Sequence, residues 1–368
     1  SLCRLMTLPS DTYFKNGVSI AIFIDTMQRN FILTDVMKTG FYHDLEEFIS
    51  MNTMKQQSFD CTGDYFTLHN YDLDSYDRRL AIIDTRPQNQ CYEDNVEFKQ
   101  ELKRRVELLK SQCFVFIKSN PWESKRAQTQ IGLYPQIDIE HIKWTGDCSW
   151  FWWYMYRKYK TYDYSFKHEA KKFEFLYLNK TQKRHREALF DRIGKRVKET
   201  SLISNWPDIK LPAEYENHFP YPPRGMDQNL VRSQYEDTKY SLLSESSIEH
   251  GEIFMTERLW KSIIAEHVFV VHGNPLYLQK LRELGFKTFS KYLDESYDLE
   301  HDNALRIEKI AKTCENLIDA DWKDIYLQSK SLRKHNKDIF FNKEKLGQEI
   351  DKTLALFLEF ADSSQVSS

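Results

Sequence analysis

The sequence is poor in glycine, and the common nucleotide-binding motifs built on glycine are missing. Only 11 of the 368 residues are glycine, and no Gly-x-Gly occurs. The dinucleotide fingerprint and the phosphate-binding loop both use glycines to let the backbone approach a phosphate, and neither motif is present. His-Glu-x-x-His, the zinc-protease motif, is absent too. These absences exclude dinucleotide-binding enzymes with the glycine fingerprint, nucleotide-binding enzymes with the phosphate-binding loop, and zinc proteases with the His-Glu-x-x-His motif.

Cysteine pairs and long apolar segments are lacking as well. The six cysteines all lie more than four residues apart, which excludes zinc-ribbon and Cys-x-x-Cys redox sites and favours a reducing compartment. The longest apolar run, residues 148–156, is far shorter than the roughly 20 residues of a membrane-spanning helix. The first residues lack the pattern of a signal peptide. We therefore expect a cytoplasmic protein with no membrane span.

The composition is that of a folded protein. Hydrophobic residues make up 41% of the chain and aromatic residues 14%, which excludes wholesale disorder. The length suits two domains or one large one. Residues 144–164 are unusually aromatic. Either a helix packed between domains or an aromatic platform for a substrate would explain that stretch.

Alternating strand and helix signals in the first half predict a parallel α/β layer. Short apolar runs at 18–24, 80–84 and 113–117 end in polar or turn residues, as buried strands do. Between the last two runs, apolar residues recur at helical spacing from Phe98 to Leu109. Strand, helix and strand in this order favour parallel pairing.

A change of composition near residue 165 predicts a domain boundary. Residues 167–198 carry eleven Lys or Arg against four Asp or Glu, and a strand is expected at 173–178. Strand and helix signals then alternate again, interrupted by the proline-rich stretch 205–224, which predicts a long surface loop. The predicted domains are an N-terminal α/β domain at 1–165, a second α/β domain at 166–302, and C-terminal helices at 303–368 that pack back on the domains.

Helix starts in the second half predict an anion site. Thr256 can cap a helix that begins with Glu257 and Arg258, and an apolar strand at 268–271 follows it. In a parallel α/β layer such helix starts lie at the carboxyl edge of the strands, where ligands bind. A helix N-terminus with an arginine favours phosphate.

A second helix is predicted directly after the strand at 268–271. Asn274 is a suitable N-cap, Pro275 a favoured first helical residue, and Gly285 a typical end. Asn274 would then stand at the same edge as the start of the first helix.

Two segments resemble the donor site of the α-1,3-fucosyltransferases. Glu245-Ser246-Ser247 is followed, after eight residues, by Thr256-Glu257-Arg258. That order is similar to the family signature of Glu-Asn-Ser, a short gap, and Tyr-Val/Ile-Thr-Glu-Lys before a helix. In this chain Ser246, Phe254 and Arg258 stand in the places of Asn, Tyr and Lys, and an arginine keeps the charge of lysine but not its geometry.

The second segment is a strand that ends at Asn179 and precedes a helix with Arg184 and Arg186. It is similar to the element that contacts the nucleotide diphosphate in that family. The whole resemblance covers about residues 175–290, a third of the chain. Residues 273–298 also resemble a segment of sugar-transferase-like proteins of phages and giant viruses, so the expected compartment is the cytoplasm of a host cell if the source is viral.

The resemblance implies a GT-B architecture, in which two Rossmann-like domains face a cleft. It implies an inverting glycosyltransferase that needs neither metal nor cofactor. The donor would be a GDP- or UDP-linked sugar, with fucose as one candidate, and the acceptor a glycan hydroxyl. Arginines would stabilise the leaving diphosphate, Glu257 would bind the ribose or the sugar, and Glu245 would orient it. The implied donor-binding residues are Asn179, Arg184, Arg186, Glu245, Thr256, Glu257, Arg258 and Asn274.

The catalytic base is expected in the N-terminal domain, opposite the donor. It should be a carboxylate or histidine at the carboxyl end of a strand. Asp25 directly follows the strand at 18–24, and Glu123 lies just beyond the strand at 113–117. Asp147 is a third candidate. An aspartate at the end of a strand is also a common turn residue, which is the structural alternative to a catalytic role.

Other functions fit parts of the sequence. The chain could be a non-catalytic α/β protein that binds a ligand or partner, such as a viral structural component. The basic stretch 167–198 could bind nucleic acid, although the net charge of −3 argues against it. Asp72-Leu73-Asp74 has the spacing of metal-dependent sugar transferases, and His267 and His272 bracket a strand, but neither pair is a strong metal signal. The acidic run 294–302 is predicted to be a solvated turn.

Overall fold

A computed structural model describes two parts of the chain. In the first 149 residues it describes five strands. In the second part it describes residues 165–349 with gaps at 180–181, 206–208, 217–229, 247 and 249–252, and six single residues elsewhere: 152, 155, 156, 159, 160 and 352. By its internal contacts the chain divides into one compact unit of Ser1–Ser149 with Lys343–Ser368 and a second unit of Trp150–Asn342.

The first unit contains a five-stranded sheet in the order β1-β2-β3-β4-β5. Strand β1 is antiparallel to β2, and the remaining neighbours are parallel. The three strands predicted from the sequence are present as β1, β3 and β4, whereas β2 and β5 were not predicted. The helix expected between Phe98 and Leu109 lies outside the described residues. The bounds are β1 Ile20–Ile24, β2 Asn30–Asp35, β3 Leu80–Asp84, β4 Cys113–Ile117 and β5 Ile142–Thr145.

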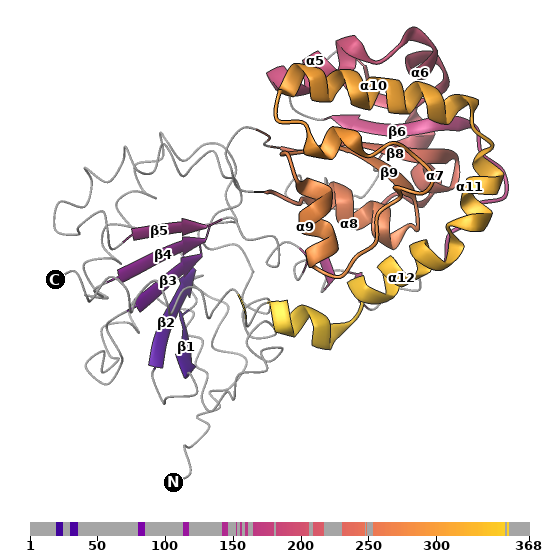
Figure 1. The fold of residues 1–368 in the computed structure, drawn as a ribbon. Coiled ribbons are helices and arrows are strands. Elements are labelled where there is room, and N and C mark those ends of the chain that lie inside the picture. The colour runs from indigo at the N-terminus through magenta and orange to yellow at the C-terminus, as the bar shows by residue number, and fades with distance from the viewer. Residues whose placement is uncertain are drawn as a thin grey trace. The chain divides into compact units, whose positions relative to one another are not determined.

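The second unit contains a fully parallel four-stranded sheet in the order β7-β6-β8-β9 (Figure 1). Its strands are rich in apolar residues, and all five residues of β9 are buried, as expected for a sheet covered on both faces. An α/β fold is therefore established for this unit. The bounds are β6 Phe173–Asn179, β7 Leu202–Asn205, β8 Thr238–Ser244 and β9 Val268–His272.

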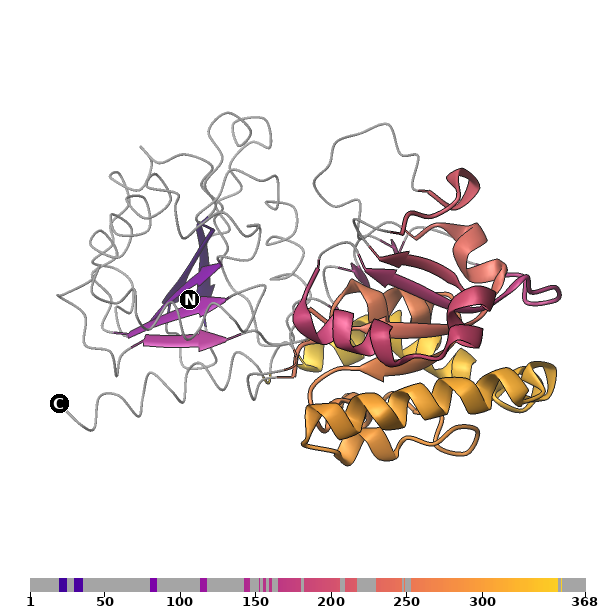
Figure 2. The same ribbon diagram turned by 90° about the horizontal axis from the view of Figure 1, so that it is seen from above.

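Helices cover both faces of this sheet (Figures 1 and 2). Helices α5, α6 and α10 pack together on one face, and α7, α8 and α12 cover the other. The bounds are α5 Arg184–Arg192, α6 Lys195–Thr200, α7 Arg232–Glu236, α8 Glu257–Ile264, α9 Tyr277–Glu283, α10 Asn303–Asp319, α11 Trp322–Gln328 and α12 Lys330–Phe340. Among the described residues, no helix is both long enough and apolar enough to cross a membrane.

The strand order creates a topological switch point between β6 and β8. The chain passes from β6 to its neighbour β7 on one side, and then returns to β8 on the other side of β6. The connections that leave β6 and β8 therefore turn toward opposite faces of the sheet. In open α/β sheets this divergence leaves a crevice at the carboxyl ends of the two strands, which is where ligands bind.

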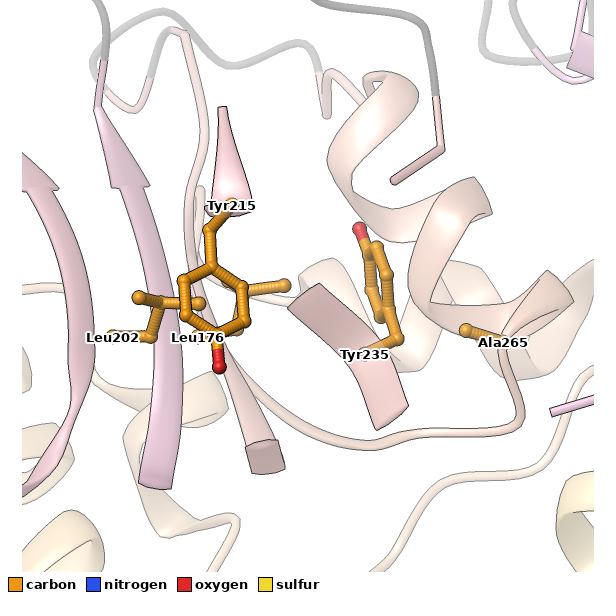
Figure 3. Close-up of a cluster of buried hydrophobic side chains, with 5 residues drawn as sticks. All are labelled: Leu176, Leu202, Tyr215, Tyr235 and Ala265. Carbon is orange, nitrogen blue, oxygen red and sulfur yellow. The ribbon is translucent and has the colours of Figure 1, made fainter. Parts of the chain in front are cut away.

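The described part of the proline-rich stretch is mostly exposed, as the surface-loop prediction expects, but one residue anchors it to the core. Its described part contains a short 3-10 helix, η6 (Ala213–Tyr215). Tyr215 is buried in a cluster with Leu176, Leu202, Tyr235 and Ala265 (Figure 3). The Tyr215 hydroxyl donates a hydrogen bond of 2.6 Å to Asp237 Oδ2. A large aromatic ring that reaches a polar partner anchors the segment despite its prolines.

Four described residues of the aromatic stretch 144–164 are buried in the core: Trp152, Met155, Tyr156 and Tyr159. Trp152 is fully buried and stacks on Trp260 with 5.6 Å between ring centroids. Its Nε1 donates a hydrogen bond of 2.9 Å to the carbonyl oxygen of Phe340. A tryptophan that is buried and hydrogen-bonded in this way stabilises the fold and offers no free face to a substrate.

The start of α9 differs from the prediction. The helix begins at Tyr277, after Leu276 in the left-handed conformation with φ 65°, so Asn274 is not its N-cap. The carboxylate of Asp298 takes that role, because it accepts hydrogen bonds from the backbone N–H of Leu278 at 2.7 Å and of Gln279 at 3.1 Å. Asp298 lies in the acidic run 294–302, which is therefore not wholly a solvated turn.

The end of α9 agrees with the prediction. Gly285 follows the helix with φ 94°, a conformation that glycine adopts without strain. Its N–H bonds to the carbonyl of Arg282, and the N–H of Phe286 bonds to that of Leu281. This double pattern is a Schellman motif, and the buried Phe286 ring fixes it to the core.

Replacing Asp298 should destabilise the second unit. Asp298→Ala removes the acceptor for two helix N–H groups and should lower the free energy of unfolding by about 1–2 kcal/mol. Asp294→Ala is the matched control, because Asp294 lies in the same acidic run but is exposed, and its side chain bonds only within its own turn. Urea denaturation measures both. Equal midpoints for the two variants would contradict the capping role.

Candidate functional site

The polar residues of the candidate site gather at the switch point, where β6 and β8 end. Asn179 is the last residue of β6, and Glu245 and Ser246 directly follow β8. Helix α5 follows β6 and brings Arg186, and helix α8 follows β8 and brings Arg258. The topology thus places side chains from both halves of this unit at one edge.

Two guanidinium groups converge on one hydroxyl at this edge. Arg186 Nη2 and Arg258 Nη1 each donate a hydrogen bond of 3.4 Å to Ser246 Oγ. Arg186 also donates to the carbonyl oxygen of Glu245 at 3.2 Å, and Arg258 Nε to that of Leu178 at 3.5 Å. The arginines are 72 positions apart in the sequence, and the fold brings them to the same point.

Burial makes this pair of cations electrostatically costly. Arg186 is only 2% exposed. Desolvation, with the charge of Arg258 beside it, lowers the pKa of Arg186 to about 9. Lys183 adds a third cation, because its Nζ donates a hydrogen bond of 2.6 Å to the carbonyl of Ser246. An arrangement that concentrates positive charge in a poorly solvated place is stabilised when an anion binds there.

Two carboxylates accompany the cations. Glu257 Oε1 lies 3.4 Å from Arg258 Nη1, as an ion pair that is largely buried on both sides. Glu245 is the second, and it interacts electrostatically with both arginines: its charge acts to raise the pKa of Arg186, and the charge of Arg258 acts to lower the pKa of Glu245. Among the described residues at this edge, three cations stand against two carboxylates.

Glu245 holds the start of α8 in place. Its carboxylate is fully buried and accepts hydrogen bonds from the Thr256 N–H at 3.1 Å, the Thr256 hydroxyl at 2.6 Å and the Tyr277 hydroxyl at 2.6 Å. Burial raises the pKa of Glu245, and the charge of Arg258 acts in the opposite direction. Its carboxylate therefore ties the end of β8 to α8 and α9, and acts on the site through these neighbours.

Thr256 caps α8, as the sequence predicted. Its hydroxyl accepts a hydrogen bond of 3.4 Å from the N–H of Arg258 while it donates to Glu245. Because the capped turn carries both Glu257 and Arg258, the position of Thr256 fixes the backbone from which these charged side chains extend.

Gly273 allows the Tyr277 ring to reach Glu245. A Cβ atom at position 273 would lie 2.5 Å from a ring carbon of Tyr277, well inside van der Waals contact. Glycine at the end of β9 therefore lets α9 approach the sheet closely. The hydrogen bond from the Tyr277 hydroxyl depends on this approach.

Two buried asparagines at the same sheet edge carry polar atoms without a partner. Asn179 is 1% exposed, and neither its amide nitrogen nor its amide oxygen is hydrogen-bonded to any described residue. Asn274, two residues beyond β9, is 4% exposed, and its Oδ1 likewise lacks a described partner. A buried amide left unsatisfied costs about 1–3 kcal/mol, so such groups commonly face a ligand or water.

The predicted and observed site residues differ at one helix start. Arg184 is exposed and makes no hydrogen bond or ion pair with a described residue, so it does not join the cluster. Lys183, which was not predicted, does join it. Lys183 and Arg186 are three residues apart and share a helix face, whereas Arg184 points elsewhere. Ser246 and Tyr277 were not predicted as site residues either.

Two neutral histidines, His185 and His272, pack next to the candidate site. His185 Nε2 donates to the carbonyl of Glu245 at 2.9 Å, and its ring lies 5.7 Å from that of His272. His272 is fully buried, with Nδ1 3.3 Å from Ser244 Oγ and Nε2 3.3 Å from Asn303 Oδ1. Burial lowers the pKa of His185 to about 4 and that of His272 to about 3.

Metal binding receives no support from the described residues. Within them no group of three or more His, Cys, Asp or Glu side chains is arranged to hold a metal ion. His267 directly precedes β9 and is hydrogen-bonded to Ser241 and to the carbonyl of Tyr235. His272 is the last residue of β9, so the two histidines lie at opposite ends of the strand. Asp72 and Asp74 lie outside the described residues, as do the three candidate bases Asp25, Glu123 and Asp147.

No protein-family model, curated protein or solved structure matches this chain. The resemblance to the fucosyltransferase donor site therefore stays an interpretation of the sequence, and the geometry described above is independent of it.

Stability should fall as the pH is lowered below about 6.5. The unfolded chain binds protons to His185 and His272 near pH 6.5, whereas the folded chain leaves both neutral down to about pH 4 and 3. The unfolded state then binds more protons, so acidification favours it. The midpoint of urea unfolding should decrease between pH 6.5 and 5, above the range in which most carboxylates titrate.

The histidine variants test the cause. His272→Gln should make this pH dependence less steep, whatever its effect on stability at pH 7. His185, His168 and His267, whose pKa values are also lowered, should keep the rest of it. His301→Gln, at an exposed position, should keep the wild-type slope. An unchanged slope in His272→Gln would show that the buried imidazole is not responsible.

Proposed function

We propose that the protein is a glycosyltransferase of the GT-B type, and that its second unit binds a nucleotide-diphosphate sugar. The observation that carries this proposal is the convergence of Arg186, Arg258 and Lys183 around Ser246 at the switch point. The α/β fold of the unit and the place of the cluster within it suit a nucleotide ligand.

The hydrogen bonds at Ser246 favour an exchangeable partner. Distances of 3.4 Å are at the long end of the range for N–H···O bonds, so the serine hydroxyl is a weak acceptor for two guanidinium groups. A diphosphate oxygen would accept shorter, charge-assisted bonds from the same groups. It would also neutralise the repulsion between Arg186 and Arg258.

The buried asparagines suit the uncharged part of such a ligand. A carboxamide offers both donors and an acceptor, which matches sugar hydroxyls and the edges of a base. Asn179 lies at the end of the same strand that precedes Arg186, and Asn274 follows the strand next to β8. A ligand with an anionic centre and polar, uncharged ends would therefore satisfy groups that the described residues leave without partners.

The proposed reaction is an inverting transfer. A base removes the proton of a glycan hydroxyl, whose oxygen forms a bond to the anomeric carbon while the bond from that carbon to the diphosphate breaks. The leaving diphosphate takes the electron pair, and Arg186, Arg258 and Lys183 stabilise its charge. The base would come from the first unit, where Asp25 and Glu123 are the preferred candidates and Asp147 the third.

A nucleic-acid-binding role for the basic stretch is less well supported. Several of its cations are paired with carboxylates: Lys172 with Asp237, Arg192 with Glu308 and Arg196 with Asp319. These pairs reduce the positive charge that the stretch presents to a polyanion. A non-catalytic protein with the same ligand site is the alternative that the experiments below distinguish.

Nucleotide diphosphates should bind to the wild-type chain and raise its melting temperature. The screen contains GDP and UDP with their sugar conjugates, and also CMP and its sugar conjugate, which carry a single phosphate. A ligand at 100 times its dissociation constant adds roughly 2.7 kcal/mol of stability. Arg258→Ala should weaken binding by about 1.5–3 kcal/mol, because a charge-assisted hydrogen bond is lost. Arg186→Ala should do the same if it folds.

Arg192→Ala is the matched control, because Arg192 lies on the same helix as Arg186 but pairs with Glu308 at the surface. It should bind as the wild type does. No stabilisation by any nucleotide, or equal binding by Arg258→Ala and Arg192→Ala, would contradict the proposed site.

Turnover distinguishes an enzyme from a binding protein. With a donor identified by the screen, Asp25→Asn or Glu123→Gln should reduce the rate by about 10²–10⁴-fold while donor affinity stays unchanged. Rates are measured as release of the nucleoside diphosphate in the presence of glycan acceptors. If the donor binds but no nucleoside diphosphate is released with any acceptor, the non-catalytic alternative is favoured. Normal rates in both variants would show that neither Asp25 nor Glu123 is the base.

A further inference from the structure

A second cluster of ionisable side chains lies at the opposite, amino edge of the sheet. Lys171, two residues before β6, donates hydrogen bonds from Nζ to His168 Nδ1 at 2.9 Å and to the carbonyl oxygen of Tyr235 at 3.0 Å. Its Nζ also lies 5.6 Å from the centre of the Tyr326 ring. None of these residues belongs to the site at the carboxyl edge.

The two hydrogen bonds fit a neutral amine. A neutral lysine has two N–H groups and one lone pair, and the two acceptors use both N–H groups. The lone pair then points away from them and stays free to attack an electrophile. An ammonium group here would have no counter-charge in contact among the described residues, since Lys171 forms no ion pair with any described carboxylate.

One positive charge and two neutral imidazoles lie near Lys171. The Arg333 guanidinium of α12 lies 4.3 Å from the centre of the same Tyr326 ring. His168 and His267 face the amine from the preceding segment and from β9. Two carboxylates, Glu236 and Asp237 at the end of α7, act in the opposite direction and favour the charged form of Lys171.

These two carboxylates have other partners. Glu236 accepts a hydrogen bond from the N–H of Lys167, and Asp237 is bound by Lys172 at 2.9 Å and by Tyr215 at 2.6 Å. Burial, followed by the charge of Arg333, lowers the pKa of Lys171 to about 7.

The adjacent lysine provides an internal comparison. Lys172 is exposed and forms an ion pair with Asp237. Its hydrogen bonds to Asp237 and to Tyr215 raise the pKa of Lys172. Two neighbouring lysines on one segment thus have opposite environments.

We propose that Lys171 is a nucleophilic lysine and a site of acylation by reactive acyl donors such as thioesters and acyl phosphates. In this step the Nζ lone pair forms a bond to the acyl carbon, and the bond from that carbon to the leaving thiolate or phosphate breaks with its electron pair. The proton released from Nζ passes to water. Lys171 remains partly exposed, so a small acyl donor reaches it.

Competitive labelling of the wild-type chain tests this proposal. The full chain is treated with trace N-acetoxysuccinimide at a series of pH values from 6 to 10, and acetylation of each lysine is measured by peptide mass spectrometry. At pH 7.5 Lys171 should react about tenfold faster than Lys172, because a much larger fraction of it is neutral, although a less basic amine is intrinsically less nucleophilic. Its rate should level off above about pH 8, while that of Lys172 keeps rising to pH 10.

Two further measurements complete the test. Glu236→Gln removes a neighbouring negative charge and keeps an acceptor for Lys167, so the midpoint of Lys171 labelling should move to lower pH. Acetyl phosphate at pH 7.5 should acetylate Lys171 in preference to Lys172. Faster labelling of Lys172 at pH 7.5, parallel rate profiles up to pH 10, or an unchanged midpoint in Glu236→Gln would each overturn the proposal.

Discussion

The candidate site depends on the buried carboxylate of Glu245. It accepts three hydrogen bonds, two from Thr256 and one from Tyr277, and so joins the end of β8 to the starts of α8 and α9. The carbonyl of the same residue accepts from Arg186 and His185 on the other face. A buried charge needs such partners to be tolerated, and the partners are then fixed in turn. The position of the cationic cluster around Ser246 follows from this network.

Several elements of both units could be predicted from local patterns. The apolar runs bounded by turn residues gave β3, β4, β6 and β9 nearly to the residue, and the capping preference of Thr256 gave the start of α8. Strand β7 has only two apolar residues before Ser204 and Asn205, too few for a signal. The cap of α9 comes from Asp298, some 20 positions beyond the helix start, so no local rule could identify it.

The site was predictable to the extent that its residues stand at element ends. Asn179, Glu245, Thr256 and Arg258 follow from the rule that parallel strands present their carboxyl ends to a ligand. Lys183 could have been found from its three-residue spacing to Arg186, whereas Tyr277 could not, because its bond to Glu245 spans 32 positions and requires Gly273 beneath the ring. The proposed function rests on these contacts together with the resemblance to the fucosyltransferase donor site. The cluster around Lys171, at the amino edge of the same sheet, is a separate feature.

A crystal structure of the full chain with a nucleoside diphosphate, GDP or UDP, tests the central claim most directly. The account predicts that the diphosphate lies at the carboxyl ends of β6 and β8, with phosphate oxygens within hydrogen-bond distance of Arg186 and Arg258 and with the bonds from both arginines to Ser246 Oγ replaced. Electron density for the nucleotide at any other place, with the contacts at Ser246 unchanged, would contradict it.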